Sequence, residues 1–314
     1  MNENENEIDT VELVLVATGL KFPEGPVSRP DGSVIVVEIE GQQITQISPD
    51  GAKTVICRVP GGPNGAAIGP DGALYICNNG HAMDFATDGE IRGPTGSLSS
   101  QYTGGSIQRV DLRSGDITTI HSHFNGKPLL APNDLVFDKA GGLWFTDHGF
   151  RRDMSLQLGA LYYASIDGQE IRCVRKSILS PNGVGLSPDE TTVYFADTRS
   201  ARLYRCPLAG PGRAVRSNQV PGEVVATLPG NVGLDSLAVM ADGSVCVATV
   251  EKGGIAHIDG DKIKGWLRLP DHLTTNICFG GDDMRTAWIT CSGTGYLYMA
   301  RWPIPGLRPN FWDR

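Results

Sequence analysis

A short pattern of apolar, polar and β-branched positions recurs six times along the chain. Each copy has an apolar stretch with one polar residue, then a turn usually built on Asp and Gly, and then a run of alternating β-branched and aromatic residues. The polar residue stands seven positions before the turn in every copy, and the six polar residues are Glu24, Asn64, Asn133, Asn182, Asp235 and Asn276. Extended runs joined by an Asp-Gly turn are typical of β-hairpins. The sequence therefore predicts six hairpins, each with one polar side chain in the same place.

The spacing of these hairpins predicts the architecture. Successive polar residues are about 50 residues apart on average, which leaves room for four strands of about 5–6 residues and their turns. Six such antiparallel units around an axis form a β-propeller. A complete sixth unit after Asn276 would overrun residue 314, so we expect segment 11–17 to supply its outer strand and close the ring. The prediction is an all-β, six-bladed β-propeller over residues 11–314 as a single domain, preceded by a disordered arm over residues 1–10.

The composition agrees with a fold built from short strands. The 314 residues include 40 glycines and 20 prolines, without a collagen period or a low-complexity block. This excess indicates many tight turns rather than a few long helices. The net charge of −8 argues against a nucleic-acid partner, because the phosphate backbone binds basic surfaces.

The sequence also predicts the cellular setting. No stretch reaches the roughly 18 apolar residues of a membrane span, and residues 1–10 lack the basic and apolar regions of a signal peptide. The seven cysteines are scattered and form no CxxC pair, which favours reduced thiols over disulfides or a zinc site. We therefore expect a cytoplasmic protein with no nucleic-acid and no membrane partner. Nothing in the sequence indicates the oligomeric state.

The hairpin geometry collects polar residues at one end of the predicted propeller. Residues about seven positions after each turn lie beside the polar residue that precedes it, and these second residues are Glu38, Asn78, Asp147, Asp197, Thr249 and Cys291. The first set surrounds the channel and offers two carboxylates and four amides, without Cys or His. Such oxygen ligands suit Ca²⁺, Mg²⁺ or Mn²⁺. A single Asn is explained by its use in turns, but six polar residues in register favour a metal site.

Two further features bear on the site. The longest interval, between Asn64 and Asn133, carries an insertion over residues 81–104 that is rich in Gly, Ser, Thr and Asp. Loops of this length are either functional or disordered, so a lid over the site and a surface loop both stay open. His148, which follows Asp147, is a candidate substrate contact or a packing residue.

Five linked motifs carry a family resemblance. They are FPEGP (22–26), APNDLVFD…GGLWFTD (131–147), SPNGVGLSPDE…VYFADT (180–198), LDSLAVMADGSVCVAT (234–249) and TTNICFGGDD…AWIT (274–290). With them the chain resembles the gluconolactonase/senescence-marker-protein (regucalcin) family of six-bladed propellers, which hold one divalent cation in the central channel.

The resemblance implies a ligand set and a substrate pocket. The motif positions imply that the cation is bound by Glu24, Asn133, Asn182 and Asp235. Asp147 lies near the cation or its waters in some relatives, and we expect Asn64, Asn133, Asp147 and His148 to contact the substrate. His148 departs from the family, since many relatives carry proline there, so the resemblance does not determine the shape of the pocket or the substrate.

The leading hypothesis is a metal-dependent hydrolase that opens a sugar lactone or a related small cyclic ester. The cation, Ca²⁺ or alternatively Mg²⁺, Mn²⁺, Zn²⁺ or iron, would polarise the carbonyl and hold the oxyanion. Asp235 would accept a proton from the attacking water. Two alternatives stay open: a phosphotriesterase similar to diisopropyl-fluorophosphatases and paraoxonases, and a non-catalytic calcium-binding propeller.

Overall fold

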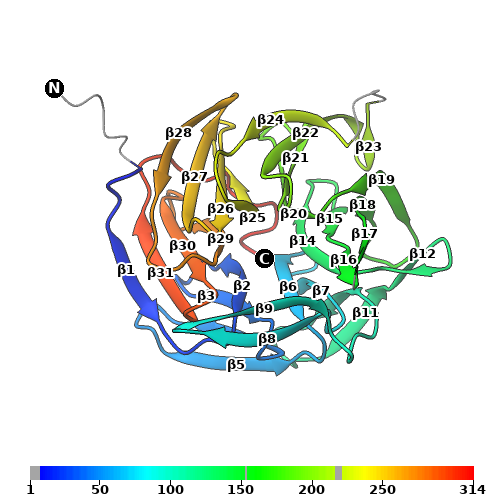
Figure 1. The fold of residues 1–314 in the computed structure, drawn as a ribbon, viewed down its shortest axis with the longest axis horizontal. Coiled ribbons are helices and arrows are strands. Elements are labelled where there is room, and N and C mark those ends of the chain that lie inside the picture. Colours follow the sequence, from blue (N-terminus) through cyan, green and yellow to red (C-terminus); the bar gives the residue numbers. More distant parts are fainter. Residues whose placement is uncertain (1–7, 153, 216–220) are drawn as a thin grey trace.

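Six antiparallel sheets surround a central axis in the computed structural model of the chain (Figure 1). The structure describes residues 8–152, 154–215 and 221–314, and within these ranges it contains strands and turns but no helix. No described segment is therefore a helix able to cross a membrane. The prediction of an all-β, six-bladed β-propeller is confirmed.

Each blade is built on four antiparallel strands, and the first strand lies nearest the axis. Blade 1 consists of β2 (Pro23–Ser28), β3 (Val34–Glu38), β4 (Gln43–Ile47) and β5 (Lys53–Arg58). Blade 2 consists of β6 (Pro63–Ile68), β7 (Leu74–Asn78), β10 (Ser106–Val110) and β11 (Ile117–His121). Blade 3 consists of β14 (Pro132–Phe137), β15 (Leu143–Asp147), β18 (Gly159–Ala164) and β19 (Ile171–Ile178).

The second half of the ring repeats this plan. Blade 4 consists of β20 (Pro181–Leu186), β21 (Thr192–Asp197), β22 (Arg202–Gly210) and β24 (Glu223–Thr227), with the short β23 (Arg213–Ala214) paired to the end of β22. Blade 5 consists of β25 (Gly233–Val239), β26 (Val245–Val250), β27 (Gly254–Asp259) and β28 (Lys262–Leu267). Blade 6 consists of β29 (Thr274–Gly280), β30 (Thr286–Cys291), β31 (Tyr296–Arg301) and β1 (Leu13–Ala17).

Three small hairpins lie outside the blades. They are β8 (Met83–Asp88) with β9 (Ile91–Leu98), β12 (His123–Phe124) with β13 (Lys127–Pro128), and β16 (Phe150–Arg152) with β17 (Ser155–Gln157).

The N-terminal strand closes the ring. β1 pairs antiparallel with β31, so a strand from the start of the chain is the outer strand of the last blade (Figure 1). This confirms the closure expected for segment 11–17. Residues 1–7 of the predicted disordered arm lie outside the described residues. Ile8 is buried between blades 5 and 6, and Asp9 accepts a hydrogen bond from Trp266 N at 2.5 Å, so these two residues belong to the packed chain rather than to a solvated arm.

The core lies between the blades. Buried apolar side chains form a cluster between each pair of neighbouring blades. In β3, Ile35 and Val37 pack toward blade 2, whereas Val34 and Val36 pack toward blade 6. Strands buried on both faces are apolar at successive positions rather than at every second one.

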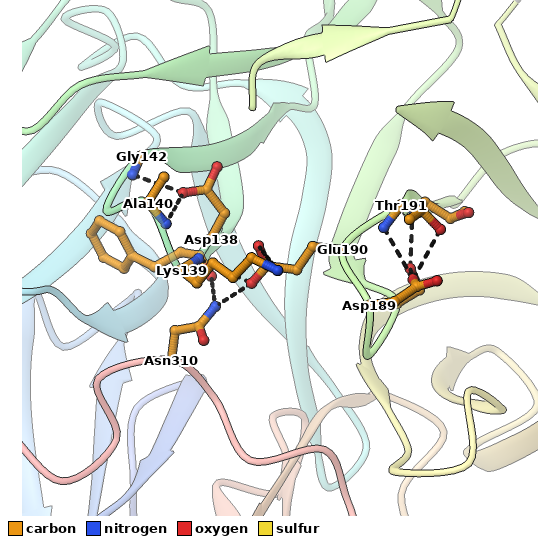
Figure 2. Close-up of polar contacts among 11 residues, drawn as sticks. Asp138, Lys139, Ala140, Gly142, Asp189, Glu190, Thr191 and Asn310 are labelled. Atoms are coloured by element: carbon orange, nitrogen blue, oxygen red, sulfur yellow. Dashed lines mark hydrogen bonds and ion pairs between the residues drawn. The ribbon is translucent and has the colours of Figure 1, made fainter. Parts of the chain in front are cut away.

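The C-terminal segment, residues 302–314, crosses the end of the channel opposite Glu24. Its backbone N–H groups at Gly306 and Leu307 donate to Met284 O and Val239 O, in blades 6 and 5. Asn310 Nδ2 donates to Phe137 O at 3.0 Å and to Glu190 Oε1 at 2.7 Å, which joins it to blades 3 and 4 (Figure 2).

The same segment reaches the remaining two blades. Phe311 packs against the apolar clusters that blade 2 shares with its neighbours, and Trp312 Nε1 donates to Ser28 Oγ of blade 1 at 2.9 Å. The segment and the inner strands enclose a mainly apolar cavity of about 200 Å³, and Asp134 and Asn276 line its opposite end. The C-terminal segment therefore plugs the channel and contacts every blade.

We expect Trp312→Ala to lower the free energy of unfolding by about 3–5 kcal/mol, the usual cost of removing a buried Trp. Trp312 is 6 % exposed, and its loss leaves Ser28 Oγ without this donor. Urea unfolding of the variant and of Asp313→Ala, which changes the exposed neighbour, checks the prediction. Equal midpoints for both variants would show that the plug does not stabilise the ring.

Candidate active site

Each inner strand carries an irregularity beside its polar residue. In every blade the register between the first and second strands shifts there, so that one extra residue of the inner strand is accommodated. In blade 1, for example, Glu24 pairs with Val37 and Val27 pairs with Ile35. A β-bulge re-aims side chains and bends the strand, and bulges are common next to active sites. The six bulges therefore present six polar residues at one end of the channel.

Glu24 is buried and linked to the last blade. Asn276 Nδ2 donates to Glu24 Oε2 at 2.9 Å, and the Gly25 N–H donates to the same oxygen at 2.9 Å. Gly25 has a φ of +47°, and a Cβ there would lie 2.4 Å from Asn64 O. Only glycine allows β2 and β6 to approach this closely, so the Gly after Glu24 sets the spacing of the ring.

Asn182 and Asp235 form the second link of the ring, between blades 4 and 5. The Asn182 side chain donates a hydrogen bond to the Asp235 carboxyl. Asn182 Nδ2 also lies 3.2 Å from Thr198 Oγ1, and Ser236 Oγ lies 3.5 Å from Asn182 Oδ1. Asp235 is half-buried, so it is the more accessible of the two predicted carboxylate ligands.

Asn133 differs from the other amides. It is buried, and its side-chain oxygen, Oδ1, has no hydrogen-bond partner. A buried acceptor without a donor costs about 1–3 kcal/mol, so Asn133 Oδ1 is an atom of the polar ring that can accept a ligand. Asn64 occupies the equivalent place in β6 and is also buried. Its predicted contact with substrate stays a prediction.

Asp134 is a third carboxylate at the site, and the sequence reasoning missed it. It is buried, its Oδ1 accepts a hydrogen bond from Leu135 N at 2.8 Å, and the Ser236 side chain bonds to it across the channel. The available signal was its position: the residue after the polar one is glycine in three other blades, at Gly25, Gly65 and Gly183.

Burial raises the pKa values of all three carboxyls. Burial raises the pKa of Glu24 to about 7, with a contribution from the Asp134 charge, although hydrogen bonds from Asn276 and Gly25 act in the opposite direction. Burial also raises the pKa of Asp134 to about 7. The pKa of Asp235 lies well above its usual range because of burial first and the Glu24 charge second. Three acids that resist ionisation together favour a bound positive charge.

The second set of residues lies beside the first and supports it. Asp147 pairs with Pro132, is 2 % exposed, and accepts 2.7 Å hydrogen bonds from the N–H groups of Leu130 and Ala131. It thereby fixes the segment that leads to Asn133. Burial raises its pKa, while these N–H groups lower it. The geometry makes Asp147 a support for the Asn133 segment, and its predicted contact with substrate stays a prediction.

His148 is half-buried at the same end of the propeller. Its backbone N–H donates to Ala131 O at 3.0 Å, and its Nδ1 lies 3.2 Å from Gly149 O. Burial lowers the pKa of His148, so the imidazole is neutral at pH 7. Its predicted role as a substrate contact stays a prediction.

The donor set fits a hard divalent cation. Glu24, Asp235, Asn133 and Asn182 offer only oxygen ligands, and the partnerless Asn133 Oδ1 is among them. Among the described residues no three His, Cys, Asp or Glu side chains are grouped as ligands. Two of the four expected ligands are asparagines, so the expected set does not require such a group.

The comparison with protein families decides the assignment. Residues 22–293 match the model of the SMP-30/gluconolactonase/LRE-like region, which spans all six inner strands. The chain belongs to the SMP-30/gluconolactonase/LRE-like family.

Similar proteins of known sequence or structure are consistent with this family membership. The lactonase drp35 of Staphylococcus haemolyticus is 29% identical over 262 residues, which cover 80% of this chain and 71% of that protein. A gluconolactonase from Xanthomonas campestris has the same fold, with a TM-score of 0.70 and 21% identity over 95% of this chain and 91% of the other. Regucalcin from Agrobacterium tumefaciens, described as a calcium-binding protein, gives a TM-score of 0.69. It is 21% identical, and the match covers 93% of this chain and 95% of the other. Membership of the SMP-30/gluconolactonase/LRE-like family supports the hydrolysis of lactones.

Proposed function

We propose that the protein is a lactonase that depends on one divalent cation and opens a sugar lactone or a related small cyclic ester. The observation that carries the proposal is the buried, partnerless Asn133 Oδ1 within a ring that also contains Glu24 and Asp235. The lactonases and gluconolactonases among the relatives support the reaction class, and the calcium-binding relative supports the cation.

Four residues would hold the cation: Glu24, Asn133, Asn182 and Asp235. When bound, a divalent cation supplies Lewis-acid polarisation of the lactone carbonyl and stabilises the negative charge that develops on its oxygen. Calcium fits this set best, because it accepts carboxylate and amide oxygens in flexible geometry. Mg²⁺, Mn²⁺, Zn²⁺ and iron are the other candidates.

The chain's own residues perform the proton transfers. Asp235, as the more accessible carboxylate, accepts a proton from the attacking water as the water oxygen bonds to the carbonyl carbon. The ring C–O bond then breaks, and the departing alkoxide takes up the proton that Asp235 holds. The net reaction converts lactone and water into a hydroxy acid, which releases one proton at neutral pH. Asn133 and Asn182 fix the orientation of the carbonyl.

Proton release from a sugar lactone tests the proposal. Protein stripped with a chelator should be inactive, and addition of a divalent cation should restore turnover. Turnover of a phosphotriester in preference to lactones would replace the proposal with a phosphotriesterase. Inactivity toward both substrates with every cation, in protein that binds Ca²⁺, would replace it with a non-catalytic calcium-binding propeller.

A further inference from the structure

The insertion over residues 81–104 forms a hairpin that belongs to no blade. β8 and β9 pair with each other across a turn at Gly89–Glu90, and neither joins the sheet of blade 2. The insertion leaves the blade after Asn78, at the end of β7 that pairs with the start of β6. The hairpin therefore lies on the face of the propeller that carries the polar ring.

Beyond blade 2, from which it extends, the hairpin is fixed to blades 1 and 6. The Phe85 ring packs against Phe22 of blade 1, with centroids 4.9 Å apart. Arg92 Nε lies 2.6 and 2.8 Å from the two carboxylate oxygens of Glu40, in the β3–β4 loop of blade 1. The Arg92 N–H donates to Gly293 O at 2.9 Å, in the β30–β31 loop of blade 6. The hairpin extends as a strap from β7 across blade 1 toward β31 (Figure 1).

The base of the strap is tied to blade 3. Tyr102 donates from its hydroxyl to Leu130 O at 2.6 Å, and its ring lies 5.1 Å from that of Phe150. Where the chain enters and leaves the insertion, Gly80 and Gly104 touch: a Cβ on Gly80 would lie 2.0 Å from Gly104 O. The two chain segments that enter and leave the insertion are therefore in contact with each other.

The residues that the insertion contacts are close in sequence to the candidate ligands. Phe22 lies two residues before Glu24, and Leu130 lies three residues before Asn133. Phe22 also has a φ of +57°, an uncommon conformation for a bulky residue. The insertion thus contacts the segments that enter β2 and β14, through Phe85 of the strap and Tyr102 at its base.

The opposite side of the same face lacks such a cover. In blades 4 and 5 the loops between the second and third strands are short, covering residues 198–201 and 251–253. These blades carry Asn182 and Asp235. On this face the hairpin therefore contacts blades 1 and 6, whereas the loops between the second and third strands of blades 4 and 5 carry no such hairpin.

We propose that the strap, residues 83–98, is a fixed wall of the substrate pocket that selects lactones by size, with the Arg92–Glu40 ion pair as its latch. The inference rests on the proposed function, because it places the lactone at the polar ring. Substrate enters over blades 4 and 5, and a substituent that extends toward blades 1 and 6 meets the strap. Small lactones are therefore favoured over lactones with long side chains.

Release of the latch tests the proposal. In Glu40→Gln, we expect the ratio of kcat/KM for a long-chain lactone to that for an unsubstituted lactone to rise about tenfold, within the usual range for pocket discrimination. The charge-swapped double variant Glu40→Arg, Arg92→Glu should restore the wild-type ratio. Glu223→Gln, which breaks the Arg205–Glu223 pair on the outer strand of blade 4, is the matched control and should leave the ratio unchanged. An unchanged ratio in Glu40→Gln, with faster hydrogen exchange at the Arg92 amide, would overturn the proposal.

A second readout separates this inference from the proposed function. Carbodiimide coupling of a small and a bulky amine to Asp235, followed by mass spectrometry, measures access without any substrate or cation. We expect Glu40→Gln to increase coupling of the bulky amine relative to the small one. If no lactone is hydrolysed, the proposed function fails, and equal amine ratios in wild type and Glu40→Gln would overturn the strap as a wall.

Discussion

Asp235→Asn is expected to lose about 10³-fold in kcat for lactone hydrolysis while the propeller stays folded. Proton transfer by a positioned carboxylate contributes roughly 10²–10⁴-fold, and the amide that replaces it has no basic oxygen. Asn has nearly the same volume, so packing against the Asn182 side chain is retained. The substitution also removes one of two charged ligands, so the affinity for the cation should fall as well.

Steady-state proton release at saturating cation, with circular dichroism as the test of folding, checks this prediction. Asp242→Asn is the matched control, because Asp242 is in the same blade at the opposite end of the channel. Its Oδ1 accepts a hydrogen bond from Ser244 N at 2.9 Å in the turn, far from the polar ring. The control should be less stable but fully active per folded molecule. Wild-type rates in Asp235→Asn would remove Asp235 from the mechanism.

The second large effect is a loss of stability with rising pH in protein kept free of divalent cations. Glu24 and Asp134 have pKa values of about 7 in the folded protein, against about 4 in an unfolded chain. Below pH 4 both states hold the protons. Between pH 4 and 7 the folded state keeps protons that the unfolded state releases, so the free energy of unfolding falls as the pH rises. Each carboxyl contributes on the order of 3–4 kcal/mol to this loss.

Urea unfolding at pH 5 and pH 8, with chelator and with excess Ca²⁺, measures the effect. Ca²⁺ at a thousandfold excess over its Kd should restore about 4 kcal/mol at pH 8. His148 and His257, whose pKa values burial lowers, act in the opposite direction, because their unfolded forms bind protons more readily. Asp134→Asn removes one carboxyl without altering the histidines or the four expected ligands, and it should reduce the loss. Equal stability of the chelated protein at pH 5 and pH 8 would contradict the account.

The strand plan was predictable because local chemistry encodes it. Five of the six hairpin turns place an aspartate whose side chain accepts the N–H two residues later, as Asp31 and Asp242 do with Ser33 and Ser244. In blade 3 the equivalent position is Ala140, and Asp138 bonds the Ala140 and Gly142 N–H groups instead (Figure 2). The number of residues between each turn and its polar residue is constant, and it therefore corresponds to a constant position of that residue in the blade.

The candidate site was predicted less completely. Alternation of apolar residues does not reveal the extra residue of a bulge, so the re-aiming of Glu24 and its equivalents was visible only in the structure. Asp134 was missed because it directly follows Asn133, which was already assigned as a ligand of the cation. The strap could not be assigned from a polar composition, since its position depends on contacts of Phe85 and Arg92 with residues distant in sequence. Such contacts leave no periodic signal.

The pairing of β1 with β31 imposes an order on folding during synthesis. β1 leaves the ribosome before any other described strand, but its partner is about 280 residues later in the chain. At roughly 5–20 residues per second, β1 waits on the order of 14–60 s for that partner, while Val14 and Leu15 add apolar surface to an unpaired strand edge. Unpaired edges are templates for pairing with other chains. Blades 1 to 5 can form in sequence behind the ribosome, and the yield of correctly closed protein is then set by how well the nascent β1 avoids other partners.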